Sequence, residues 1–203
     1  QTEYDKAVTL YNELKTFLNP STDPVVVAVL DTGVDLDHPD LKDVLVDGYD
    51  ATGSSSGAQD ENGHGTHCAG IIAAEPNSSE SPTGVANMAS VKIMPVKVLG
   101  GSGSGGFQEI EKGIRWAMKE GATVISMSLG AGLEYDDLGG KPEVLENGVI
   151  TEAINQGIIV VIAAGNESCE LGEACSGGGF FRKKYEEYIV LPCSYSGAIC
   201  IGA

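Results

Sequence analysis

Four apolar runs, each ending at glycine or polar residues, dominate the hydrophobic pattern of the chain. The first is VVVAVLDTG from Val25, and the others span residues 90–100, 121–130 and 157–166. Their length and their content of β-branched residues favour strands over helices, and continuous apolar character is typical of strands buried on both faces. Helical patterns lie between them at residues 107–121 and, less regularly, 142–157, and each ends at a glycine suited to a helix C-cap.

This alternation predicts an α/β fold with three layers, in which a mostly parallel β-sheet is flanked by helices. Binding and catalytic sites of such sheets form at the carboxyl ends of the strands. Asp31, Ser128 to Gly130, and Gly165 with Asn166 each come just after a strand, so we expect them to converge. The polar, glycine-rich tracts fall between predicted elements, which favours one domain over residues 1–203.

The chain is strongly acidic, with 29 acidic and 12 basic side chains and a net charge of -17. This charge repels phosphate backbones and anionic lipid surfaces, so we expect neither a nucleic acid nor a membrane as partner. No stretch approaches the roughly 20 apolar residues of a membrane span. The acidic residues are spread along the chain, which favours a solvated surface, with cation binding as the alternative.

Five cysteines divide into one isolated residue and four that crowd the C-terminal end: Cys68, then Cys169, Cys175, Cys193 and Cys200. The four late cysteines can form two disulfides in any of three pairings, which suits an oxidising compartment. A zinc site is the competing interpretation, but no C-x-x-C pair occurs. We therefore expect a secreted or extracellular protein whose signal peptide and propeptide have been removed.

The stretch NGHGTHCAG holds two histidines, His64 and His67, three residues apart and with no acidic residue inside the motif. A zinc hydrolase helix has its histidines four apart with a glutamate beside the first, so metal ligation is disfavoured. A general base is the better interpretation of His64, with Asp31 to orient the ring. Asn166 can donate an amide N–H to an oxyanion. Alone, Asp31 suits a helix N-cap or turn, and Asn166 suits a turn.

Together these segments resemble the subtilisin-like serine proteases, the subtilases. VLDTG matches the motif of the catalytic aspartate at Asp31, and NGHGTHCAG matches that of the catalytic histidine at His64. SMSLG is similar to the strand that binds the substrate backbone, and AAGN to the oxyanion segment with Asn166. The four motifs occur in the family's order, and the resemblance extends from about Val25 to the end of the chain. The substrate-binding residues it implies on that strand are Ser128, Leu129 and Gly130.

The resemblance implies further parts of a peptide-binding site. GGSGSGGF is similar to the segment that lines an outer substrate pocket, where Phe107 offers an apolar wall. Ala163 and Gly165 would form the floor and side of the primary pocket. The HCAG motif resembles that of the proteinase K branch of the family, which implies that Cys68 is an unpaired thiol beneath the active site. The resemblance thus implies broad cleavage with a preference for apolar side chains.

A structural calcium site is also implied by the resemblance. Gln1, Asp40 and Asn77 stand at positions where relatives supply oxygen ligands, and calcium prefers such hard oxygen donors. No organic cofactor is expected. An acidic segment, GLEYDDLGG, is predicted to be a solvated loop; if Glu134, Asp136 or Asp137 reached the primary pocket, basic substrates would be preferred.

One part of the family pattern is missing from the 203 residues. The nucleophilic serine of the family lies in a G-T-S-x-A motif, which does not occur here. ICIGA matches a strand that precedes it, so the resemblance covers the N-terminal two-thirds of the catalytic domain. We therefore expect a serine endopeptidase, acting on peptides or proteins through an acyl-enzyme, whose serine lies on a missing or separate C-terminal segment. Without that partner the chain is predicted to be inactive; a non-catalytic peptide-binding module is the alternative.

Overall fold

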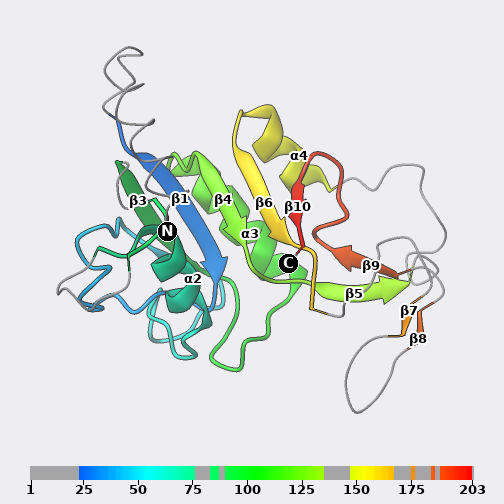
Figure 1. Ribbon diagram of the computed structural model, residues 1–203, viewed down its shortest axis with the longest axis horizontal. Helices are drawn as coiled ribbons and strands as arrows, with labels where there is room; N and C mark the ends of the chain where they lie inside the picture. Colours follow the sequence, from blue (N-terminus) through cyan, green and yellow to red (C-terminus); the bar gives the residue numbers. More distant parts are fainter. Residues whose placement is uncertain are drawn as a thin grey trace, which may run out of the picture.

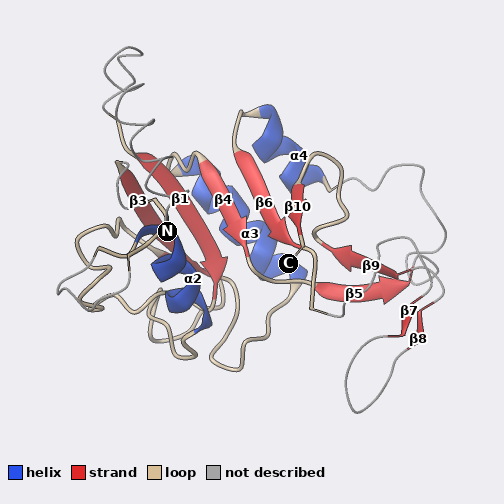
Figure 2. Ribbon diagram, viewed as in Figure 1, coloured by secondary structure: helices blue, strands red, loops and turns tan. Residues whose placement is uncertain are grey.

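A six-stranded sheet forms the centre of the molecule (Figures 1 and 2). The computed structural model describes residues 23–75, 83–86, 90–134, 147–166, 175–176, 184–185 and 188–202. The strand order is β10-β6-β4-β1-β3-β2, and every neighbouring pair is parallel. The strands are β1 (Val25–Asp31), β2 (Tyr49–Asp50), β3 (Val91–Lys97), β4 (Val124–Met127), β6 (Ile159–Ala163) and β10 (Ile199–Ile201). The four predicted apolar strands are β1, β3, β4 and β6.

Helices cover the two faces of this sheet, and the side chains of β1 alternate between them. Val27 and Val29 belong to a hydrophobic cluster with α2 (His64–Ala73). Ala28 and Leu30 belong to a second cluster that contains α3 (Phe107–Lys119) and α4 (Gly148–Asn155). Because successive side chains of a strand point to opposite faces, β1 is buried on both. The predicted three-layer α/β architecture is therefore confirmed (Figure 1).

The two predicted helices form for identifiable local reasons. In α3, Ile110, Ile114 and Ala117 recur at helical spacing and are all buried. In α4, the side chain of Asn147 accepts hydrogen bonds from the backbone N–H groups of Val149 and Ile150, which is the usual N-cap arrangement. The less regular helical pattern at residues 142–157 therefore becomes a helix from Gly148, directly after this cap.

Two antiparallel pairs of strands lie outside the main sheet: β5 (Ala131–Glu134) pairs with β9 (Tyr188–Leu191), and β7 (Cys175–Ser176) pairs with β8 (Lys184–Tyr185). The loop predicted for GLEYDDLGG is wrong for its first residues, because Gly132 to Glu134 belong to β5. The strand that stabilises them lies more than fifty residues later in the sequence, where local pattern carries no information about pairing. Asp136 and Asp137 lie outside the described residues.

A disulfide joins Cys193 to Cys200, which resolves part of the cysteine pairing that the sequence left open. Cys68 is free. Cys169 lies outside the described residues. No helix in the described part of the chain is long and apolar enough to cross a membrane.

Candidate active site

The end of β1 and the start of α2 bring Asp31 and His64 together. Nδ1 of His64 lies 2.8 Å from Oδ1 of Asp31, and the backbone N–H of Thr32 donates to the same oxygen at 2.7 Å. Asp31 is fully buried, whereas the side chain of His64 is 49% exposed. With the carboxylate as acceptor, Nδ1 carries the proton, so Nε2 is left as the acceptor nitrogen of a neutral ring. This is the arrangement of an oriented general base.

The close approach of α2 to β1 requires glycine at position 65. A Cβ atom there would collide with the carbonyl oxygen of Gly33 and lie 3.0 Å from Cβ of Asp31. Gly63, at the helix N-cap, has a φ of 103°, which L side chains rarely adopt. The glycines of NGHGTH thus determine how near the imidazole can come to the carboxylate.

A groove of about 460 Å³ opens beside His64. Five of the predicted site residues line it in addition to His64, namely Phe107, Ser128, Leu129, Gly130 and Asn166. They come from segments far apart in the sequence, as the rule for parallel sheets predicted. No Asp, Glu, Lys or Arg lines the groove in the part of the chain that the structure describes. An uncharged wall of this kind suits apolar or neutral groups of a ligand.

Ala163 and Gly165, predicted for the primary pocket, are not among the residues that line this groove. Ala163 ends β6, and Gly165 follows with a φ of 99°, on the stretch that leads to Asn166. Leu191 and Pro192 do line the groove, and the sequence analysis missed them. They sit at the end of β9, whose pairing with β5 carries them to this wall. No local motif marks them.

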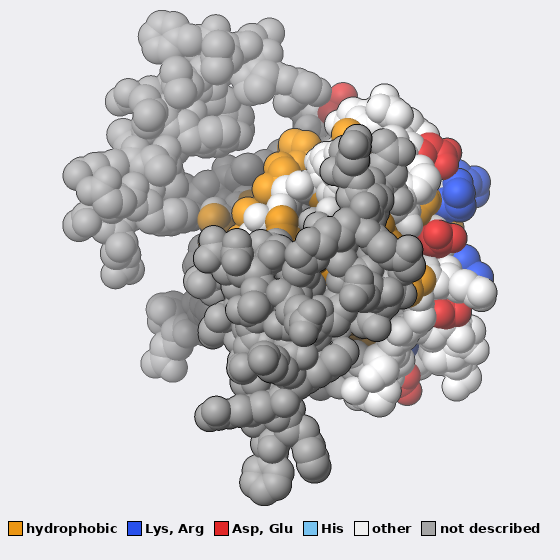
Figure 3. Space-filling view, turned by 90° about the vertical axis from the view of Figure 1, so that its right-hand side faces the viewer, with side chains coloured by type: hydrophobic (Ala, Val, Ile, Leu, Met, Phe, Trp, Pro, Cys, Tyr) orange, Lys and Arg blue, Asp and Glu red, His pale blue; other side chains and the backbone are white. Residues whose placement is uncertain are grey.

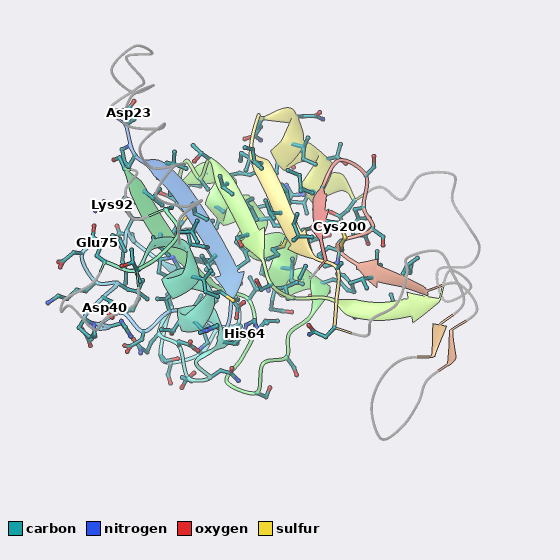
Figure 4. All side chains as sticks on the ribbon, viewed as in Figure 1. Asp23, Asp40, His64, Glu75, Lys92 and Cys200 are labelled. Atoms are coloured by element: carbon teal, nitrogen blue, oxygen red, sulfur yellow. A yellow bond between two sulfur atoms is a disulfide. The ribbon has the colours of Figure 1, made fainter. Side chains whose placement is uncertain are left out.

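Asp40 is the one predicted calcium ligand within the described residues, since Gln1 and Asn77 lie outside them. Asp40 is a buried residue, with 8% exposure. Its backbone carbonyl accepts a hydrogen bond at 2.8 Å from the N–H of Glu75, just after α2. In Figure 4, Asp40 and His64 lie on opposite sides of α2. The structure therefore places one of the predicted ligands, Asp40, at a buried position.

Among the described residues, Asp31, His64 and Cys68 form the single group of three potential metal ligands, with ligand atoms within 4.8 Å of one another. Sγ of Cys68 lies 4.0 Å from Nδ1 of His64. Burial raises the pKa of the Cys68 thiol, which keeps it protonated at neutral pH. An ion bound to these three residues would have to displace the hydrogen bond between His64 and Asp31. The arrangement therefore favours the hydrogen-bonded pair over a metal centre.

Comparison with known proteins agrees with this geometry. A family model described as the subtilase family matches residues 22–203. Thermitase of Thermoactinomyces vulgaris is 44% identical over 140 residues, which are 69% of this chain and 47% of the relative. The major intracellular serine protease of Bacillus subtilis is 40% identical over 184 residues, or 88% of this chain and 50% of the relative. The chain thus spans about half the length of these relatives.

The predicted secreted or extracellular location is wrong by the same comparison. The Bacillus subtilis relative is an intracellular protease by name, and so is the intracellular serine protease of Paenibacillus polymyxa. The latter is 44% identical over 147 residues, which are 70% of this chain and 42% of the relative. The prediction rested on cysteine number. A single described disulfide and a free Cys68 are compatible with relatives that work inside the cell.

Proposed function

Because the chain belongs to the subtilase family, we propose that it supplies the base and the oxyanion donor of a serine endopeptidase. The observation that carries this proposal is the 2.8 Å contact between Nδ1 of His64 and Oδ1 of Asp31, at the edge of an uncharged groove. Asp31 orients the ring and stabilises its charged form, and Nε2 of His64 exchanges the proton. Asn166, which also lines the groove, donates to the oxyanion of the tetrahedral intermediate.

In the proposed reaction a serine hydroxyl attacks the scissile carbonyl and passes its proton to His64. The imidazolium then protonates the leaving amine, which yields an acyl-enzyme that water hydrolyses by the same proton transfers in reverse. The serine would come from a C-terminal segment of the same protease, either continuous with residues 1–203 or on a separate chain. Residues 1–203 would then form part of a single peptidase domain.

The substrate would bind along Ser128 to Gly130 as an extended strand, with its side chains in the uncharged groove. Phe107 would contact an apolar side chain, whereas Ala163 and Gly165 would border the side chain next to the scissile bond. This arrangement favours broad cleavage with a preference for apolar residues. The names of the relatives support an intracellular site of action.

We also propose a structural calcium ion held by Asp40 together with Gln1 and Asn77. The buried carboxylate of Asp40, beside the segment after α2, is the structural support. Removal of calcium with a chelator would then lower the thermal unfolding temperature of the chain. An Asp40→Asn variant would lose most of that sensitivity. Equal unfolding temperatures with chelator and with added calcium would contradict the proposal.

The proposed function is tested by labelling the native protein with a fluorophosphonate, which reacts with activated serines, and by intact mass measurement. We expect label on a serine outside residues 1–203, on an extension of this chain or on a polypeptide that copurifies with it. A His64→Ala variant should lose the labelling, because the serine then has no base. If nothing is labelled while peptides still bind to the groove, the protein is the non-catalytic peptide-binding module instead.

A further inference from the structure

The carboxylate of Asp60 contacts both of the segments that carry the Asp31–His64 pair. Oδ1 of Asp60 accepts a hydrogen bond from Oγ1 of Thr32 at 2.8 Å, and Thr32 is the residue after Asp31. Oδ2 of Asp60 accepts from the backbone N–H of Thr66 at 3.0 Å and from its hydroxyl at 2.6 Å. Thr66 lies in the first turn of α2, two residues after His64. Asp60 therefore connects the end of β1 to the start of α2.

The first turn of α2 depends on such external acceptors. The N-cap residue is Gly63, which has no side chain with which to accept a hydrogen bond. The exposed N–H groups at a helix start need partners, and a negative charge there is favoured by the helix dipole. Three of them bond to side chains outside the helix: His64 N–H to Asn62, Gly65 N–H to Thr32, and Thr66 N–H to Asp60. Asp60 is the charged member of this set.

Lys97 holds the residues on both sides of Asp60. Its Nζ donates to the carbonyl oxygen of Gln59 at 2.9 Å and to Oε2 of Glu61 at 2.7 Å. Lys97 is fully buried at the end of β3, where it pairs in register with Asp31 of β1. A buried ammonium is stable only when acceptors surround it, so these bonds fix the loop on the sheet.

The carboxylate of Asp60 stays ionised at neutral pH. Burial raises its pKa, but hydrogen bonds from Thr66, Gly63 and Asn62 outweigh that effect and lower the pKa to about 2. The hydrogen bonds it accepts are therefore charge-assisted, which makes them stronger than neutral ones.

We propose that Asp60 is a positioning residue that holds His64 against Asp31, and that Lys97 anchors it. Asp60 touches neither member of the pair; it acts through Thr32 and Thr66. Without it, the first turn of α2 loses its charged acceptor, and the imidazole is free to rotate away from the buried carboxylate. The catalytic role of the Asp31–His64 pair rests on the proposed function. The contact between the two side chains is seen in the structure independently of that function.

The test is an Asp60→Asn variant of the 203-residue chain, followed by NMR of ¹⁵N-labelled histidines. Asparagine keeps the shape but presents an N–H₂ group to donors at Thr66 or Thr32. In the parent protein we expect His64 as the Nδ1–H tautomer. In the variant we expect loss of the Nδ1 proton signal and a shift toward the Nε2–H tautomer, observed in long-range ¹⁵N–¹H correlation spectra. His38 is an internal reference, because its Nδ1 accepts from the N–H of Asp40 and should not change.

Asp50→Asn is the matched control. Oδ1 of Asp50 also accepts from the N–H and hydroxyl of a threonine, Thr52, at 2.8 and 2.7 Å, and Asp50 lies in β2 beside Lys97. This variant removes the same charge nearby without touching Thr32 or Thr66, so the His64 signals should be retained. An unchanged His64 tautomer in a folded Asp60→Asn variant, or an equal change in Asp50→Asn, would overturn the proposal.

A second pair of variants keeps the proposal testable if Asp60→Asn does not fold. Thr66→Val removes the hydroxyl that donates to Asp60, whereas Thr66→Ser retains it. We expect the Nδ1–H signal of His64 to weaken only in the valine variant. Equal signals in both variants would count against Asp60. None of these measurements requires a serine, so an inactive protein leaves the test intact, and a failed test leaves the proposed function standing.

Discussion

The two lateral halves of the sheet, one around β1, β3 and α2 and the other around β6 and β10, differ in how they are held together. Around β1, β3 and α2, side chains such as Val29 and Ile93 are fully buried, and polar groups are tied by hydrogen bonds. At β6 and β10, three isoleucines are about half exposed, namely Ile159, Ile199 and Ile201. Figure 3 shows a small group of hydrophobic side chains among the described residues on the right-hand side of the molecule as drawn in Figure 1. The side that carries Asp31 and His64 is thus distinguished by its hydrogen-bond network and not by complete burial, since Val25 of β1 and Ile71 of α2 are also exposed.

The difference has a consequence for how the proposed site works. The geometry of the base depends on a local network that the described residues provide. The β6–β10 side is held by a buried core that includes Val160 and Ile162, by strand pairing, by a hydrogen bond at 2.8 Å from the N–H of Ala164 to the carbonyl of Ile201, and by the Cys193–Cys200 disulfide. Changes to the Asp31–His64 network should alter the chemistry, whereas changes to the buried apolar side chains of β6 should mainly alter stability.

The largest expected effect is on catalysis. In the serine-containing protease, His64→Ala should lower kcat by about 10⁶-fold, which is the size of the same effect in subtilisin itself. The free energy of unfolding should also fall, by about 1 to 3 kcal/mol, because the fully buried carboxylate of Asp31 loses a hydrogen-bond partner. Peptide hydrolysis assays and urea unfolding check the two parts. Activity within a hundredfold of the parent would show that His64 is not the base.

Next comes a pair of isoleucines on the β6–β10 side. Ile162→Ala should reduce the free energy of unfolding by about 2 to 5 kcal/mol, because the side chain is 1% exposed and its removal leaves a cavity. Ile199→Ala, at 48% exposure, should change it by less than about 0.5 kcal/mol. Urea unfolding of both variants measures the contrast. Similar losses for the two would mean that β10 is covered in solution.

The disulfide should contribute less than the core. Cys193 and Cys200 are seven residues apart, and closure of so short a loop is worth about 2 kcal/mol in the chain-entropy model. A Cys193→Ala, Cys200→Ser double variant should be destabilised by that amount while the histidine NMR signals of His64 remain unchanged. A reducing agent should have the same effect on the parent protein. Altered His64 signals would show that the two sides are coupled.

The smallest expected effect is the acid sensitivity of Asp60. Its pKa is lowered from 3.8 to about 2, so its contribution to stability is complete above pH 3.8 and is lost as the pH falls toward 2. Because Asp60 is partly exposed, solvent screening limits this contribution to about 1 to 2 kcal/mol. Asp60→Asn should therefore have a flatter stability profile between pH 4 and 2, measured by urea unfolding. Parallel stability profiles of the two proteins would mean that the Asp60 carboxylate is equally protonated in the folded and unfolded states.

Much of the fold followed from local pattern. The apolar runs gave β1, β3, β4 and β6 because strands buried on both faces have few alternatives at that length. The grouping of Asp31, His64, Ser128 to Gly130 and Asn166 followed from the geometry of parallel sheets and from the family motifs. The calcium ligands stay a prediction, since only Asp40 lies within the described residues. The secreted location was wrong because it was inferred from cysteine number, whereas relatives of this chain include proteases named as intracellular.

The sequence by itself determined where strands end and which polar residues follow them, because both depend on neighbours along the chain. Only the tertiary structure decided which distant segments meet. It paired β5 with β9, carried Leu191 and Pro192 to the groove, and joined Cys193 to Cys200. It also placed Asp60 between Thr32 and Thr66, with Lys97 behind it. Such contacts depend on the packing of whole elements, which no short stretch of sequence encodes.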